Sequence, residues 1–232
     1  MTAAILCGGL GTRLKGVLDD RPKCLAPILG CTYLDFLTDY LHSQGINNFI
    51  FATGYRHDQV DAWLLSKKRP WIGQTSREET PLGTGGALRL ASLKIKDETF
   101  FACNGDTFLT LDLRAMMNFH LKAGAPITIA AVKVSDTAEF GRLEVADGRV
   151  VGFKEKGISG PGLINGGCYV IQKSFLRAEP REVFSLEKDS FMRTGTKVAA
   201  YLTNSDFLDI GTPSRLASAD AWLAKKLQNY VH

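Results

Sequence analysis

Phosphate binding is the chemistry indicated by the segment Gly8–Gly16, which reads GGLGTRLKG and follows the apolar run Ala3–Cys7. Glycine lets backbone N–H groups approach phosphate oxygens closely, and arginine adds a permanently charged fork that matches phosphate geometry. The segment lacks the third glycine of the dinucleotide motif G-x-G-x-x-G and the Gly-Lys-Ser/Thr ending of the P-loop. It therefore predicts a phosphate-binding loop of another kind, with a tight turn and a solvated arginine as the alternative.

Four further charged residues lie next to a proline, a strand end or a helix start, positions from which a side chain can reach a binding site. Lys23 follows a proline that restricts the backbone, and Asp106 follows a predicted buried strand. Open α/β sheets bind ligands at the carboxyl ends of their strands, where a carboxylate is a useful Mg²⁺ ligand. Lys156 comes just after another strand, and Asp209 precedes a Gly-Thr-Pro helix start. Each residue alone fits a turn, a helix cap or a solvated edge as well.

Apolar periodicity predicts the elements that must position these residues. In the first half, strands over 3–7, 47–54, 71–76 and 99–106 alternate with helices over 32–45, 57–65 and 83–92. This alternation predicts an α/β fold with a Rossmann-like, doubly wound and mostly parallel sheet. The second half contains a hairpin over 142–153, strands over 163–171 and 197–203, and helices over 185–193 and 212–230. We expect the inserted β elements to form a small lobe covering one side of the sheet.

Two short signals sharpen the element boundaries. Thr32 and Asp35 are spaced as a capping box, with Gly45 as a helix stop, and Asp147-Gly148 supplies a hairpin turn.

Length and composition limit the classes of protein. A chain of 232 residues with 45% hydrophobic and 22% charged residues predicts one globular domain. Its apolar runs fall far short of the ~20 residues that span a bilayer, and the start lacks a secretion signal, so we expect no membrane partner and a cytoplasmic location. The net charge of +4 is mild and the basic run Lys67–Arg69 reads as a solvated helix end, which argues against nucleic-acid binding. Five cysteines without a C-x-x-C pair predict reduced thiols.

The order of the motifs resembles that of the sugar-1-phosphate nucleotidylyltransferases. GG-x-G-TRL, PK, LGTGGA, NGD, F-x-EK, NGG-x-Y and D-x-GTP follow one another along essentially the whole chain. The segments EETPLGTGGA, LINGGCYVI and FSLEKDSF are most similar to the bacterial D-glycero-D-manno-heptose-1-phosphate guanylyltransferases within that family. One departure is Gly157, where many members have a proline after F-x-EK.

The resemblance implies one nucleotidyltransferase domain over residues 1–232 that condenses GTP with a sugar 1-phosphate. The products would be pyrophosphate and a GDP-sugar for capsule, lipopolysaccharide or S-layer glycan synthesis. The implied acceptor is a heptose 1-phosphate, whose extra carbon would lie near FSLEKDSF and LINGG. The alternatives within the family are mannose 1-phosphate with GTP, or another sugar 1-phosphate with UTP or dTTP.

Two classes of protein outside this activity fit less well. A non-catalytic nucleotide-sugar sensor would be expected to lack Arg13, Lys23, Asp106 or Asp209, and all four are present. Molybdenum-cofactor and isoprenoid-precursor nucleotidyltransferases share a glycine-rich opening but lack the later F-x-EK and NGG-x-Y run. The sequence leaves a homo-oligomer open.

The resemblance also assigns roles to individual residues. Arg13 and Lys23 would bind the triphosphate, and Lys156 the incoming sugar phosphate. Asp106 and Asp209 would hold Mg²⁺ against the phosphates. The implied nucleotide-binding residues are Gly8, Gly9, Gly11, Glu78 and Gly83, and the implied sugar-binding residues are Gly141, Glu155 and Asn165.

Base preference can be argued from Glu78, which stands five residues before Gly83. Relatives that use UTP or dTTP have a glutamine there, whose amide suits the mixed donor and acceptor edge of a pyrimidine. Guanine offers N1–H and an amino group side by side, and two adjacent donors suit a carboxylate, which only accepts. This favours GTP, with a solvated acidic pair Glu78–Glu79 as the alternative.

Overall fold

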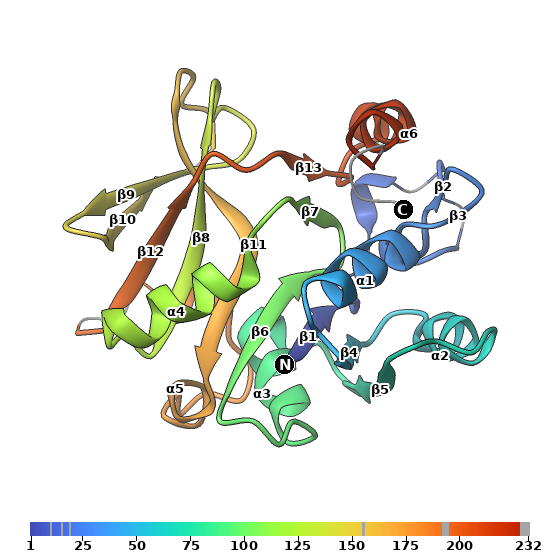
Figure 1. Ribbon diagram of the computed structural model, residues 1–232, viewed down its shortest axis with the longest axis horizontal. Helices are drawn as coiled ribbons and strands as arrows, with labels where there is room; N and C mark the ends of the chain where they lie inside the picture. Colours follow the sequence, from blue (N-terminus) through green and yellow to red (C-terminus); the bar gives the residue numbers. More distant parts are fainter. Residues whose placement is uncertain (10, 15, 19, 155, 192–194, 228–232) are drawn as a thin grey trace.

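A nine-stranded mixed sheet runs through the protein, in the order β5-β4-β1-β6-β11-β8-β12-β10-β9 (Figure 1). The computed structural model describes residues 1–9, 11–14, 16–18, 20–154, 156–191 and 195–227. The parallel part of the sheet comprises β1 (Thr2–Leu6), β4 (Asn48–Thr53), β5 (Ile72–Arg77) and β6 (Thr99–Asn104). The long strand β11 (Gly162–Gln172) is antiparallel to both β6 and β8 (Ile127–Val134), and β12 (Val198–Thr203) is parallel to β8.

Helices cover both faces of this sheet. Alternate residues of β1 divide between two buried clusters: Ala3 and Ile5 face one, and Ala4 faces the other. The first cluster receives side chains of α1 (Tyr33–Ser43), α2 (His57–Leu65), α4 (Leu113–Ala123) and α6 (Pro213–Leu227). The second receives those of α3 (Gly83–Ser92), α5 (Lys173–Arg177) and a π-helix over Leu186–Phe191. The predicted Rossmann-like α/β fold is confirmed.

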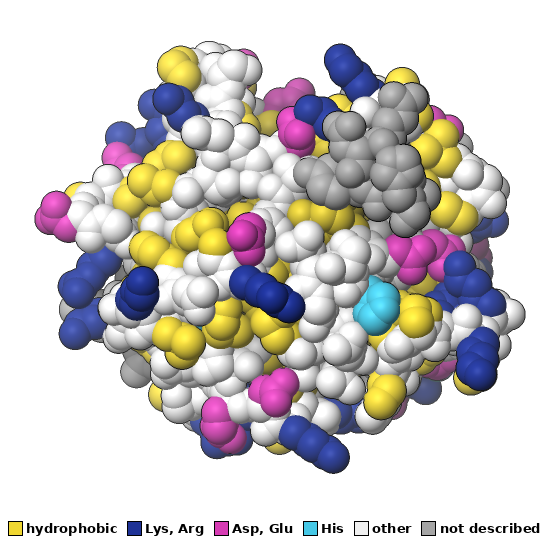
Figure 2. Space-filling view, viewed as in Figure 1, with side chains coloured by type: hydrophobic (Ala, Val, Ile, Leu, Met, Phe, Trp, Pro, Cys, Tyr) yellow, Lys and Arg dark blue, Asp and Glu magenta, His cyan; other side chains and the backbone are white. Residues whose placement is uncertain are grey.

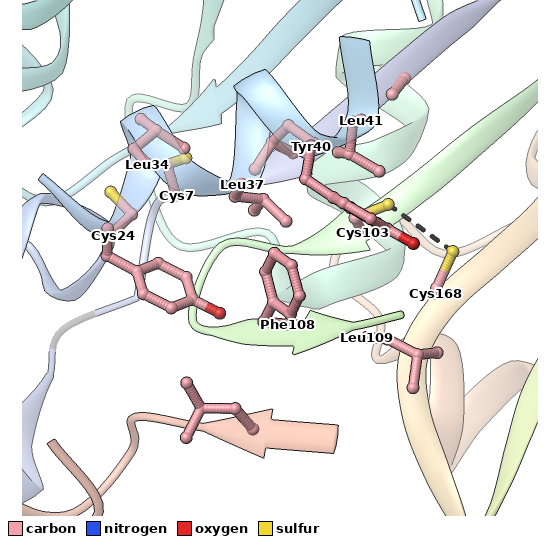
Figure 3. Close-up of a cluster of buried hydrophobic side chains, with 14 of the residues drawn as sticks. Cys7, Cys24, Leu34, Leu37, Tyr40, Leu41, Cys103, Phe108, Leu109 and Cys168 are labelled. Carbon is pink, nitrogen blue, oxygen red and sulfur yellow. Dashed lines mark hydrogen bonds between the residues drawn. The ribbon is translucent and has the colours of Figure 1, made fainter. Parts of the chain in front are cut away.

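The core beneath α1 contains leucines, aromatic rings and thiols (Figure 3). Leu34, Leu37 and Leu41 of α1 pack there, as their helical spacing predicts. All five cysteines are free thiols, in agreement with the prediction. Cys103 and Cys168 lie opposite each other on β6 and β11 with their Sγ atoms 3.7 Å apart.

Several predicted boundaries agree closely with the structure. The helices over 57–65 and 83–92 have these bounds. The Thr32–Asp35 capping box forms, with each backbone N–H bonded to the other side chain. Asp147 and Gly148 both have positive φ and join β9 (Arg142–Ala146) to β10 (Arg149–Lys154).

The position of this hairpin differs from the prediction. Instead of covering one side of the sheet, β10 pairs with β12 and the hairpin continues the sheet at its edge. Residue Leu143 of β9 also pairs with Leu163 of β11. The pairing satisfies backbone groups that β12 would otherwise leave open at a sheet edge. The β-rich lobe is thus an extension of the main sheet.

Two short ribbons lie outside the main sheet. One joins β2 (Pro27–Ile28) to β3 (Cys31–Thr32). The other joins β7 (Thr107–Leu109) to β13 (Phe207–Asp209), with Thr107 opposite Asp209. This second ribbon brings the end of the NGD motif next to the C-terminal D-x-GTP motif.

The basic run Lys67–Arg69 was predicted to be solvated, which is wrong for Arg69. Its guanidinium lies 4.0 Å from the centre of the Trp63 ring and donates to the backbone oxygen of Leu64. The Arg69 side chain is only 5% exposed and pairs with Asp35. The guanidinium therefore stacks on an aromatic ring of α2, where burial lowers the pKa of Arg69 and the charge of Asp35 opposes the shift.

The surface shows mixed charge. Among the described residues on the face drawn in Figure 2, Lys and Arg side chains are interspersed with Asp and Glu side chains. None of the helices in the described part of the chain has the length and apolar character that a bilayer crossing requires.

Candidate active site

A pocket of about 650 Å³ opens where β1, β4, β5 and β6 end. Its walls come from the residues after these strands, from the start of α3, and from Lys23 and Glu187. Six of the sequence-predicted site residues line it: Gly8, Gly9, Lys23, Glu78, Gly83 and Asp106.

The glycine loop is shaped by its neighbours. A Cβ at Gly8 would lie 3.2 Å from the backbone nitrogen of Gly54 and 3.1 Å from Oε1 of Glu78. By contrast, a Cβ at Gly9 would meet nothing within 4 Å. Gly11 has a φ of +60° and faces the aliphatic part of Lys23. The loop therefore packs tightly at Gly8 and exposes its backbone at Gly9, where a ligand can approach.

Glu78 and Glu79 have different environments. The Glu78 side chain crosses Gly54, where a Cβ would lie 2.6 Å from Oε1, and its Oε2 accepts a hydrogen bond from the backbone N–H of Leu82 at 3.0 Å. Burial raises the pKa of Glu78, and the Leu82 hydrogen bond opposes the shift. Glu79 is exposed and pairs with Arg77 at 3.2 Å. Glu79 is thus a solvated side chain, as the alternative interpretation expected, whereas the half-buried Glu78 side chain is held in place at the edge of the pocket.

The glycines at the start of α3 pack against the segment before the π-helix. Gly83 has a φ of +73°, and a Cβ there would lie 2.6 Å from the carbonyl oxygen of Phe184. That same oxygen accepts the backbone N–H groups of Gly85 and Gly86. The LGTGGA motif therefore lets α3 approach Phe184 closely, while Gly83 and Thr84 line the pocket.

Two aspartates lie at the same end of the ribbon of β7 and β13. The backbone N–H of Ile210 donates to the carbonyl oxygen of Asp106 at 3.0 Å, which sets Asp106 beside Asp209. Lys23 Nζ lies 3.2 Å from Oδ2 of Asp106, and Arg215 Nη1 lies 2.9 Å from Oδ1 of Asp209. Each carboxylate is thus paired with a cation, which offsets part of its negative charge.

This acid pair suits Mg²⁺. Across the residues that the structure describes, no group of three or more His, Cys, Asp or Glu side chains is placed to hold a metal. Mg²⁺ is commonly bound by one or two carboxylates, with phosphate oxygens and waters completing its shell. The carboxylates are 29% and 22% exposed, so oxygen ligands from a substrate can reach them.

A buried tyrosine hydroxyl is influenced by the charges of both aspartates. The Tyr33 hydroxyl is buried and has no hydrogen-bond partner among the described residues. Burial, followed by the charges of Asp106 and Asp209, raises the pKa of Tyr33 well above its usual range. It therefore keeps its proton beneath the site, although its side chain is fully buried and does not line the pocket.

The remaining predicted residues do not line the pocket. Arg13 is exposed in a 3-10 turn over Thr12–Leu14, and Lys156 is exposed with no described residue paired to it. Gly141 has a φ of +70°, and a Cβ there would lie 3.0 Å from the carbonyl oxygen of Lys154. Asn165 is half-buried on β11, and Glu155 lies outside the described residues.

Gly157 explains the departure from the proline that many relatives have. Its φ is +102°, and its backbone N–H donates to the carbonyl oxygen of Ala138 at 2.8 Å. Proline can adopt neither this φ nor this hydrogen bond. The loop before β11 is therefore tied by a hydrogen bond where those relatives have a ring.

Sequence analysis missed two charged residues. Arg215 pairs with both Asp209 and Glu139 and lies 4.2 Å from the centre of the Phe140 ring. Glu187 lines the pocket and accepts hydrogen bonds from other elements. Arg215 lies in the segment GTPSR and Glu187 in the segment FSLEKDSF, but neither segment indicates which distant residues its charged side chain will contact.

Taken together, the pocket can hold a polyphosphate. Its open glycine backbone, Lys23 and the accessible carboxylate of Asp106 are groups that bind phosphates together with a divalent cation, and Asp209 lies outside the lining, at the neighbouring end of β13. The half-buried carboxylate of Glu78 adds an acceptor for a neighbouring donor pair.

Comparison with known proteins agrees with this geometry. The family model described as "Nucleotidyl transferase" matches residues 2–226. A D-glycero-alpha-D-manno-heptose 1-phosphate guanylyltransferase of Aneurinibacillus thermoaerophilus is 36% identical, with 100% of both chains covered. A mannose-1-phosphate guanylyltransferase of Mycobacterium tuberculosis is 32% identical over 96% of this chain and 64% of its own length. The crystal structure of HddC from Yersinia pseudotuberculosis complexed with GMP-PN has a TM-score of 0.89 and 33% identity, covering 96% of this chain and 99% of that one.

Proposed function

The chain belongs to the nucleotidyl transferase family, and we propose that it transfers the guanylyl group of GTP to D-glycero-D-manno-heptose 1-phosphate. The products are a GDP-heptose and pyrophosphate. One observation carries the choice of substrates: similarity to a heptose 1-phosphate guanylyltransferase extends over the full length of both chains.

The reaction requires positioning and charge neutralisation more than covalent help from the protein. An oxygen of the sugar 1-phosphate forms a bond to the α-phosphorus of GTP as the bond to pyrophosphate breaks, in line with the attack. Both reactants are anions, so cations must offset their repulsion. Lys23 and Arg13 bind the triphosphate, and Lys156 binds the sugar phosphate. Asp106 and Asp209 would hold Mg²⁺, which would neutralise the charge that develops on the phosphate oxygens.

Guanine selection is assigned to Glu78. The carboxylate accepts N1–H and the adjacent amino group of guanine, a donor pair that uracil and thymine lack. Its backbone hydrogen bond to Leu82 and its position across Gly54 support this role, because both restrict where the side chain can point. The backbone of Gly8, Gly9, Gly11 and Gly83 lies against the nucleotide.

The sugar is bound on the β11 side of the site. Asn165, Glu155 and the backbone at Gly141 contact its hydroxyls. The proximity of Asn165 and Glu187, which are linked through Tyr169, supports placing the sugar near the FSLEKDSF segment.

The cellular setting extends the proposal. Residues 1–232 act as one catalytic domain, and the GDP-sugar serves capsule, lipopolysaccharide or S-layer glycan synthesis. Five free thiols support a reducing compartment such as the cytoplasm.

A substrate panel tests the function directly. Pyrophosphate release is measured for GTP, UTP, dTTP and CTP, each with heptose, mannose and glucose 1-phosphates. We expect GTP with the heptose to give the highest kcat/KM. A higher kcat/KM with mannose 1-phosphate would contradict the sugar choice and favour the mannose-1-phosphate guanylyltransferase activity.

Substitutions of Lys156 and Arg13 should affect the use of different substrates. Lys156→Ala is expected to raise KM for the sugar phosphate about 10-fold, the size of a charge-assisted bond, and leave KM for GTP unchanged. Arg13→Ala is expected to impair GTP use or turnover. Two Michaelis curves per variant measure the split.

Lys154→Ala is the matched control for charge loss in this region. Lys154 pairs with Glu144 at 2.6 Å, so its removal should move neither KM. The reverse pattern in the Lys156 and Arg13 variants would overturn their assignments.

A further inference from the structure

The carboxylate of Glu187 is a junction between the two sides of the site. Its Oε1 accepts the hydroxyl of Tyr169 at 2.9 Å, and its Oε2 accepts the hydroxyl of Thr84 at 2.8 Å and that of Ser185 at 3.0 Å. Tyr169 lies on β11 and Thr84 on α3, which are far apart in sequence. One side chain of the π-helix therefore holds a strand and a helix that contribute to different parts of the site.

The first branch fixes the orientation of the Asn165 amide. A carboxylate only accepts, so Tyr169 must donate to Glu187, and its oxygen is then free to accept from Asn165 Nδ2 at 2.7 Å. Asn165 Oδ1 accepts the backbone N–H of Gly167 at 2.8 Å. Burial and the Glu187 charge raise the pKa of Tyr169 well above its usual range, so the donor keeps its proton.

This polarity decides what Asn165 can offer a ligand. One of its two Nδ2 hydrogens is used by Tyr169, which leaves the second hydrogen as a directed donor. A flipped amide would place its oxygen against the Tyr169 oxygen and its nitrogen against the Gly167 N–H. The branch therefore presents an N–H to an acceptor oxygen such as that of a sugar hydroxyl.

The second branch fixes the hydroxyl of Thr84. Its oxygen accepts the backbone N–H of Leu186 at 2.9 Å, so its proton is directed to Glu187. Thr84 lines the nucleotide pocket at the start of α3. The only group that this branch has in common with the first branch is the carboxylate of Glu187.

We propose that Glu187 is a positioning residue that aligns the sugar side through Tyr169 and Asn165 and the nucleotide side through Thr84. The inference rests on the proposed function, because it assigns the two branches to two substrates. It predicts that cutting one branch weakens one substrate and spares the other.

The experiment cuts each branch with a near-isosteric change and measures both Michaelis constants. Tyr169→Phe removes one hydroxyl from a fully buried ring and should raise KM for the sugar phosphate about 10-fold, with KM for GTP and kcat within about 2-fold. Thr84→Val should do the opposite, raising KM for GTP and sparing the sugar phosphate. A thermal melt of each variant checks that the fold persists.

A double-mutant cycle tests whether Tyr169 acts through Asn165. In the Asn165→Ala background, Tyr169→Phe should add little, because the amide that it orients is gone. Thr84→Val should still raise KM for GTP in that background.

The outcomes separate this proposal from the proposed function. An inactive wild type in the substrate panel overturns both. An active wild type in which Tyr169→Phe raises both KM values equally, or is additive with Asn165→Ala, overturns the relay alone. An unchanged KM for the sugar phosphate in Tyr169→Phe has the same consequence.

Discussion

Asp106→Asn and Asp209→Asn are each expected to lower kcat by at least about 100-fold, equivalent to about 2.7 kcal/mol in the barrier. The ribbon of β7 and β13 holds the two aspartates at one end of the site, and removing either carboxylate would leave the divalent ion under-coordinated between two anionic substrates. Asparagine keeps the size of aspartate, so the fold should persist. Pyrophosphate release measured across a Mg²⁺ titration gives the result.

Asp112→Asn is the matched control for this prediction. Asp112 caps α4 by accepting the backbone N–H of Ala115, and asparagine caps helices as well as aspartate does. The control should retain wild-type turnover. Near-normal kcat at saturating Mg²⁺ in both active-site variants would remove the metal assignment.

Glu78→Gln is expected to lower kcat/KM for GTP by roughly 10 to 100-fold, the size of a lost charge-assisted hydrogen bond. The amide replaces one of two acceptors with a donor, which then faces a donor on guanine. The kcat/KM values for UTP and dTTP should rise relative to that for GTP. All of these triphosphates are compared on wild type and variant.

The acidity of Glu78 adds a pH test. Because burial raises its pKa, the carboxylate protonates at a higher pH than an ordinary glutamate. GTP use in the wild type should therefore fall as pH decreases toward that raised pKa. The Glu78→Gln variant has no group that titrates at this position, so its use of GTP should not show this fall.

Glu79→Gln is the control for the neighbouring charge. Glu79 is exposed and pairs with Arg77, so its neutralisation should leave GTP preference intact. An unchanged GTP preference in Glu78→Gln, or a wild-type preference for UTP, would contradict the guanine assignment.

Local signals made much of the fold predictable. The helix over 57–65, the Thr32–Asp35 capping box and the Asp147-Gly148 turn depend on neighbours within a few residues, and each was predicted correctly. The helix α4 was missed because one of its buried positions is His120, whose ring bonds to Thr128 at 2.9 Å. A polar residue on the buried face weakens the apolar period that marks a helix.

Elements that depend on distant partners were not predictable. Strands β7 and β13 have three residues each, too few to display an alternating pattern, and each forms only because the other is present. The edge position of the β9–β10 hairpin likewise depends on the open edge of β12.

The same distinction applies to the site. Gly8 and Asp106 follow strand ends, so their convergence could be inferred from the rule for open α/β sheets, whereas the approach of Lys23 could not. The position of Glu187 at the site could not be predicted in this way. Its carboxylate accepts hydrogen bonds from Thr84 and Tyr169, which are distant in sequence and come close to it only in the folded chain. The catalytic roles of these residues stay predictions until the variants are measured.

The ribbon that unites the acid pair also orders events during synthesis. Asp206 and Thr110, bonded at the end of this ribbon, are 96 positions apart in the chain. Ribosomes add about 5 to 20 residues per second, so the glycine loop, Glu78 and Asp106 emerge several seconds before Asp209. The nucleotide pocket is also incomplete at that stage, because Glu187 lines it and the Phe184 carbonyl holds the start of α3. Neither half of the site can therefore form until most of the polypeptide has been synthesised.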